Sequence, residues 1–262
     1  MQNERVAAAA DALAAAWRGG PRIALPSAAV APQSIDEATA IQDALHERLG
    51  YECVGWKLGM SSKAAQAANK LDGPFTGRLY KQRLHAGPAR FPADAFAHPV
   101  LEAEIAFRMA RDLKPRAGGR YTEAEVLDAV AEAVLGIEVA DNRYDAKPPL
   151  PPLLLVADNG AAGAYITGPT VANWRGLDLA AVEATLEIDG RRAADSLAGD
   201  ARCQPVPVLV WTANALSARG VGLKAGDLVT TGTACAPVPA GPGIEVVARF
   251  AGLGEVRIAI ES

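Results

Sequence analysis

Residues 99–113 read PVLEAEIAFRMARDL, and this stretch carries the strongest indication of both fold and site. Its apolar side chains recur at every second position, which is the spacing of a β-strand. Because side chains at i and i+2 share one face of a strand, Glu102 and Glu104 point the same way. The two carboxylates are either the solvated face of an ordinary strand, screened by Arg108, or two ligands aimed at a cation.

A third carboxylate, Glu138, stands in AVLGIEVAD, where its near neighbours are apolar or glycine. An isolated buried carboxylate is costly, so Glu138 pairs with an arginine or backbone donors, or binds a cation together with Glu102 and Glu104. Three convergent carboxylates would form a hard oxygen site suited to Mg²⁺ or Mn²⁺. A 2-oxo acid can offer two oxygens to such a cation, which would stabilise an enolate.

Two further segments place polar residues in apolar surroundings. Lys57, in VGWKLGM, either snorkels to the surface or is buried, where burial would lower its pKa and nearby carboxylates would raise it. Asp158 and Asn159 follow the apolar run LLLVA, and such residues either cap a helix or a turn, or approach a ligand. The backbone amides around Gly160 could hold a substrate carboxylate.

The composition indicates a globular protein and excludes several functional classes. The chain has 262 residues, a formal net charge of −4 and 50% hydrophobic residues, which suits one large domain with a substantial core. Its basic residues are scattered, so nucleic-acid binding is not expected. The sequence lacks a long apolar run, a CxxC pair, GxGxxG, Walker A and GxSxG. These absences argue against a membrane span, a cysteine zinc site, nucleotide binding and serine acyl transfer.

The pattern of elements predicts an α+β chain in two parts. Residues 1–50 form a helical N-terminal subdomain, and residues 51–262 form a catalytic β-rich domain. Asp189 and Gly190 make the turn of a β-hairpin. Strands do not alternate regularly with crossover helices, which counts against a Rossmann or TIM-barrel layout.

Two capping boxes mark where helices begin. Ser34 is followed three residues later by Glu37, and Thr122 is followed by Glu125 at the same spacing. The second box predicts a helix over 121–136, YTEAEVLDAVAEAVLG.

Five blocks in this order resemble the 2-keto-4-pentenoate hydratase/4-oxalocrotonate decarboxylase family of the fumarylacetoacetate hydrolase superfamily. They are GWKLGMSSKAAQ, PVLEAEIAFRMARDL, LGIEVADNRY, VADNGAAGAYITG and TGTACAPVPAGPGIEVVARFAGLGEVRIAI. The ExE motif alone is weak, but the ordered set, which runs from about residue 50 to the C-terminus, is specific to the family and not to one substrate. The resemblance implies a β-rich roll of the fumarylacetoacetate hydrolase type and a bound Mg²⁺ or Mn²⁺.

The resemblance also implies lyase chemistry on short 2-oxo or 2-hydroxydienoic acids of aromatic catabolism, with 2-keto-4-pentenoate hydratase-like activity expected first. Carried onto this sequence, it assigns the metal ligands Glu102, Glu104 and Glu138, the catalytic residues Lys57 and Asp158, and the substrate-binding residues Ser61, Phe75, Asn159 and Gly160. A cytoplasmic homo-oligomer with a small-molecule substrate is expected, without nucleic acid or membrane, and a complex with a pathway enzyme is a further expectation.

Three departures from the family pattern leave other functions open. Phe75 stands in GPFTGRLY where the hydratase branch usually carries an aspartate, and a phenyl ring cannot transfer a proton. Leu154 replaces another aspartate, and CQP at 203–205 replaces the usual GHP. The alternatives are a 4-oxalocrotonate-type decarboxylase, an acylpyruvate C–C hydrolase, and a non-catalytic partner subunit of such a complex.

Overall fold

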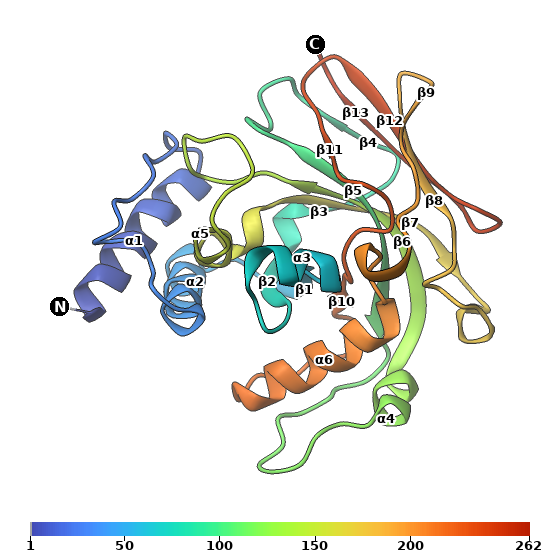
Figure 1. The fold of residues 1–262 in the computed structure, drawn as a ribbon, viewed down its shortest axis with the longest axis horizontal. Helices are drawn as coiled ribbons and strands as arrows, with labels where there is room; N and C mark the ends of the chain where they lie inside the picture. Colours follow the sequence, from blue (N-terminus) through green and yellow to red (C-terminus); the bar gives the residue numbers. More distant parts are fainter. Residues whose placement is uncertain (1) are drawn as a thin grey trace.

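The computed structural model describes residues 2–262 and shows two sheets that curl around a shared core, with helices at their edges (Figure 1). The helices are α1 (Gln2–Trp17), α2 (Ile35–Leu49), α3 (Lys63–Asn69), α4 (Glu123–Asp128), α5 (Pro152–Ala157) and α6 (Pro205–Ala218). The strands are β1 (Cys53–Gly59), β2 (Phe75–Tyr80), β3 (Leu84–Ala86), β4 (Ala89–Phe91), β5 (Val100–Met109), β6 (Val130–Ala140), β7 (Ala162–Val171), β8 (Ala184–Ile188), β9 (Arg191–Ala194), β10 (Leu228–Val229), β11 (Val238–Pro239), β12 (Ile244–Phe250) and β13 (Gly254–Ile260).

The long strands β5 and β6 lie near the middle of the larger sheet, whose order is β2-β1-β10-β5-β6-β7-β3, with β11 also paired to β5. The smaller sheet has the order β4-β13-β12-β8-β9. Two parallel pairings, β1 with β10 and β4 with β13, join the first half of the chain to its last strands. The β8–β9 hairpin turns at Asp189 and Gly190, which both adopt positive φ as a type I′ turn requires.

The register between β5 and β6 brings acidic residues face to face. Glu102 lies directly opposite Glu138, and Glu104 lies opposite Gly136. A side chain at position 136 would collide with Tyr165, because a Cβ there would lie 2.2 Å from the Tyr165 hydroxyl oxygen. The glycine therefore leaves room for the Tyr165 ring on the face of the sheet that carries the acidic residues.

The prediction of a helix over 121–136 is wrong beyond Asp128. The capping box is present, with Thr122 accepting from the Glu125 backbone, but α4 ends at Asp128 and β6 begins at Val130. Alanine-rich sequence favours a helix locally, yet here the segment pairs with β5 and buries its apolar side chains completely, as at Ala133. Tertiary pairing has overridden local propensity.

The N-terminal helices α1 and α2 pack beside α5 (Figure 1) and share a core with it. Leu13, Leu45 and Leu154 lie in this core. At the end of α1, the Trp17 indole N–H donates to the buried Asp158 carboxylate over 2.8 Å. The division at residue 50 stays a prediction. Within the described residues, no helix combines the length and the hydropathy that a membrane crossing requires.

We predict that Trp17→Phe lowers the free energy of unfolding by about 1–3 kcal/mol, because it leaves a buried carboxylate oxygen without its donor. Trp174→Phe is the matched control, since the buried Trp174 indole N–H has no hydrogen-bond partner. Urea denaturation of both variants measures the difference. An equal loss of stability in the two variants would show that the Asp158 bond contributes nothing.

Candidate metal and substrate site

Three carboxylates meet at the centre of the larger sheet. Glu102 and Glu104 share one face of β5, and Glu138 faces them from β6. One oxygen from each lies within 4.8 Å of the others. Glu104 and Glu138 are buried, whereas Glu102 lines an adjoining cavity. The structure therefore brings together the three residues that the sequence singled out.

Lys57 on β1 lies against this cluster. Its ammonium group is 2.5 Å from a Glu138 carboxylate oxygen and donates to the Gly160 carbonyl over 2.7 Å. Burial alone would lower the pKa of Lys57, but the carboxylates of Glu138, Glu102 and Glu104 outweigh it and raise that pKa. The side chain is thus a buried, charged ammonium.

One ammonium does not balance three carboxylates. Burial, reinforced by the charge of Glu138, raises the pKa of Glu102 to about 7 and that of Glu104 well above its usual range. Glu104 accepts one bond, from the Gly232 backbone N–H over 3.2 Å. Its other oxygen, and the Glu138 oxygen that does not face Lys57, are buried without a hydrogen-bond partner. Buried carboxylate oxygens without a partner are stabilised when they bind a cation or a proton.

The turn after α5 positions the carbonyl that Lys57 contacts. Asn159, Gly160 and Ala161 all adopt positive φ, at 52°, 70° and 55°. The Asn159 side chain stabilises this unusual run, because it accepts from the Arg78 backbone N–H over 2.7 Å and donates to the Arg78 carbonyl over 2.9 Å. Strained backbone of this kind persists where the surroundings over-determine it, and it gathers at functional sites.

Asp158 and Asn159 lie behind the wall of the cavity, not on it. Asp158 is fully buried, and its second oxygen accepts from the Arg143 backbone N–H over 2.7 Å. Burial raises the pKa of Asp158 to about 6, although the hydrogen bonds that the carboxylate accepts act to lower it. Together with the bond from Trp17, this geometry commits both Asp158 oxygens to protein donors.

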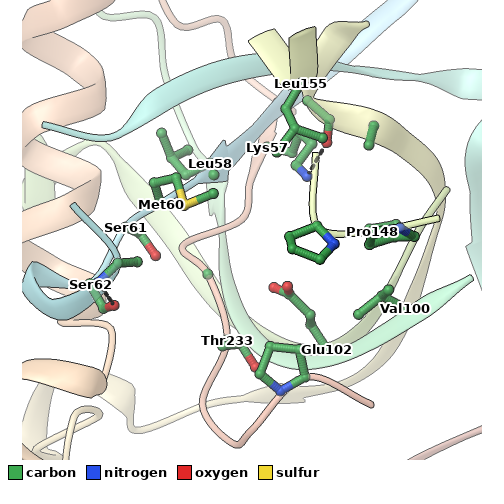
Figure 2. Close-up of a pocket in the computed structure, with 18 of the residues that line it drawn as sticks. Lys57, Leu58, Met60, Ser61, Ser62, Val100, Glu102, Pro148, Leu155 and Thr233 are labelled. Atoms are coloured by element: carbon green, nitrogen blue, oxygen red, sulfur yellow. Dashed lines mark hydrogen bonds between the residues drawn. The ribbon is translucent and has the colours of Figure 1, made fainter. Parts of the chain in front are cut away.

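A cavity of about 380 Å³ opens beside the carboxylates. Figure 2 shows Lys57 and Glu102 projecting into it from opposite sides. Ser61, Phe75 and Gly160 also line it, so these expected substrate-binding residues surround one space. The rest of the wall is largely apolar.

Some lining residues were not singled out in the sequence, among them His98, Asp141 and Asn142. Asp141 accepts from the His98 backbone N–H over 2.8 Å and pairs with Arg22 at 2.5 Å. Asp141 and Asn142 could have been found from their place in the sequence, because they come directly after the strand that carries Glu138.

The family model described as fumarylacetoacetate (FAA) hydrolase C-terminal matches residues 61–261. The chain belongs to this family. The resemblance seen in the sequence is therefore confirmed, together with the α+β fold and its helical N-terminal part.

Two relatives of this fumarylacetoacetate hydrolase family member are named as a hydratase and a decarboxylase. A 2-keto-4-pentenoate hydratase of Paraburkholderia xenovorans (strain LB400) is 32% identical over 257 residues, covering 97% of this chain and 94% of the relative. A 4-oxalocrotonate decarboxylase of Pseudomonas putida is 30% identical, covering 80% and 78%. The structure of 4-oxalocrotonate decarboxylase from Pseudomonas putida G7, complexed with magnesium and adipate, superposes with a TM-score of 0.86 at 25% identity, covering 99% and 98%.

The raised pKa of Glu102 predicts how stability depends on pH when divalent cations are removed with EDTA. A carboxyl whose folded pKa exceeds its unfolded value stabilises the protein below the unfolded pKa, and this contribution is lost as pH rises through the folded pKa. Stability should therefore fall between about pH 4.5 and about pH 7, and fall less in Glu102→Gln.

Thermal melts at a series of pH values measure this effect. Glu52→Gln is the control, because Glu52 is a 60% exposed carboxylate. Equal pH slopes in wild type and Glu102→Gln would contradict the electrostatic account of the cluster.

Proposed function

We propose that this protein is a divalent-metal-dependent lyase acting on short 2-oxo or 2-hydroxydienoic acids, with 2-keto-4-pentenoate hydratase-like activity as the first candidate. The observation that carries the proposal is the convergence of Glu102, Glu104 and Glu138, with Lys57 beside them, on a cavity of small-molecule size. The hydratase and decarboxylase relatives support the same reaction class.

The residues present fit a divalent cation. The donor set is carboxylate oxygen throughout, which suits Mg²⁺ or Mn²⁺, and the unpartnered oxygens of Glu104 and Glu138 would gain a partner. We propose Glu102, Glu104 and Glu138 as the ligands. The bound cation would supply positive charge that stabilises a developing enolate on a 2-oxo acid.

The chain's own residues have distinct proposed tasks. Lys57 offsets part of the carboxylate charge and can hold or deliver a proton at the edge of the cavity. Gly160, through its carbonyl, fixes the orientation of that ammonium. We propose that Asp158 and Asn159 are positioning residues, since their side chains are bonded to the protein and anchor the turn.

A second candidate, decarboxylation, is favoured by Phe75. Its ring lines the cavity and is 6% exposed, so it keeps one wall dry and offers no base. Excluding water protects an enolate, whereas adding water requires a base or an ordered water within hydrogen-bond reach.

The functional test is turnover with product analysis. Metal-loaded protein is mixed with 2-hydroxypenta-2,4-dienoate, 4-oxalocrotonate and an acylpyruvate, and loss of ultraviolet absorbance is followed. A hydroxylated oxo acid identifies a hydratase, CO₂ a decarboxylase, and two acids a hydrolase. Absence of turnover with every substrate would reject the lyase and leave the non-catalytic partner subunit.

We predict that Glu138→Gln and Glu104→Gln each weaken Mn²⁺ binding at least about tenfold, because each removes a charged oxygen donor. Isothermal titration calorimetry measures the affinity, with Glu132→Gln on the same strand as control. Unchanged Mn²⁺ affinity in both variants would place the cation elsewhere.

We predict that Lys57→Met lowers kcat at least about 100-fold in metal-loaded enzyme, because it removes the proton-holding group beside the cavity. The melting temperature should fall far less than activity does. Lys81→Met is the control, since Lys81 is an exposed partner of Glu52. Full activity in Lys57→Met would rule out its role.

We predict that Phe75→Asp raises the rate of dienol hydration at least about tenfold, because it places a base on the cavity wall. Decarboxylation should fall in the same variant as the wall becomes wetter. Phe75→Leu, which keeps the wall apolar, is the control. Efficient hydration by wild type with no gain in Phe75→Asp would show that the dry wall does not limit the reaction.

Location and assembly are also proposals. Cys53, Cys203 and Cys235 are free thiols, which fits the reducing cytoplasm. A small-molecule substrate is consistent with the named activities of the relatives. The homo-oligomer and the complex with a pathway enzyme stay predictions.

A further inference from the structure

The cavity wall carries little positive charge away from the carboxylate cluster. Of the described residues that line it, Lys57 and His98 are the basic ones, and Lys57 is already paired with Glu138. His98 is adjacent to acid, because its backbone N–H donates to the Asp141 carboxylate. The other charged lining residues are Glu102 and Asp141, which are both acidic, and Asp141 is paired with Arg22.

The remaining wall is built from apolar and uncharged polar side chains. Its larger apolar residues include Met60, Phe75, Leu150, Leu155, Leu197 and Pro237. The polar ones, such as Ser61 and Asn142, can donate hydrogen bonds but carry no charge. Arginine, which binds carboxylates bidentately, is missing from the described lining.

This distribution separates the two ends of a substrate. The carboxylate and keto oxygens of a 2-oxo acid belong at the cluster of Glu102, Glu104 and Glu138. A second carboxylate on the tail would then leave water to face apolar residues and two acids. Burying a charge without a partner is strongly unfavourable, whereas burying an apolar tail is favourable.

We propose, on the basis of the lyase function proposed above, that the substrate is a 2-oxo or 2-hydroxydienoic acid with a single carboxylate and an apolar tail. The wall formed by Leu150, Leu155 and Leu197 selects this tail, and tails that end in a carboxylate are rejected. This favours monocarboxylate dienols over diacids such as 4-oxalocrotonate.

Binding of a matched pair of acids tests the selectivity without turnover. Isothermal titration calorimetry on Mg²⁺-loaded protein compares 2-oxohexanoate with 2-oxohexanedioate, which have the same chain length. We expect the monoacid to bind at least about tenfold more tightly. Equal or tighter binding of the diacid overturns the proposal, and so does failure of both acids to bind.

A variant supplies the missing charge. Leu197→Arg places a guanidinium on the half-buried wall and should strengthen diacid binding about tenfold, with the monoacid changed less than about threefold. Leu197→Gln, polar but uncharged, is the control and should not produce this gain. An equal gain in both variants would contradict the charge argument.

The two proposals fail in different ways. Selective binding of 2-oxohexanoate with no turnover of any dienol rejects the lyase and supports the tail selectivity. Turnover of monoacid and diacid dienols with equal kcat/KM supports the lyase and overturns the selectivity.

Discussion

The structure depends on an electrostatic imbalance, three carboxylates held against one ammonium inside the protein. In water the three carboxylates would repel one another only weakly, but in a low-dielectric interior their mutual repulsion is strong. The β5–β6 register forces Glu102 and Glu138 to face each other, so the strands cannot relieve the repulsion by small shifts. The Lys57 ammonium and the Gly232 backbone N–H offset only part of the negative charge of the three carboxylates. The carboxylate cluster at the centre of the fold therefore favours the binding of a cation.

Sequence periodicity was sufficient to find the acidic pair, because the two-residue repeat of a strand puts Glu102 and Glu104 on one face. Glu138 stood out for a different reason, its apolar surroundings. Their mutual placement could not be read in the same way, since it depends on the register between β5 and β6. The same pairing explains why the helix expected over 121–136 gives way to a strand.

Asp158 and Asn159 show where motif reading stops. Their position after an apolar run was consistent with a cap, a turn or a ligand contact, and all three readings look alike in one dimension. The structure ties Asn159 to Arg78 and Asp158 to Trp17, partners that lie 81 and 141 positions away. Contacts this distant leave no local signature.

The acidic cluster lies on strands, whereas much of the cavity wall comes from connecting segments such as 148–150, which vary more readily.

The parallel pairings of β1 with β10 and of β4 with β13 have a consequence for synthesis on the ribosome. β1, which carries Lys57, cannot gain its β10 neighbour until Leu228 has emerged, and β4 waits for Ile258. Contacts so distant in sequence are slow to form and leave strand edges exposed in the meantime. Until β10 and β13 have emerged, one edge of β1 and the backbone of β4 therefore lack their strand partners, and this is the interval in which chaperones have most to protect.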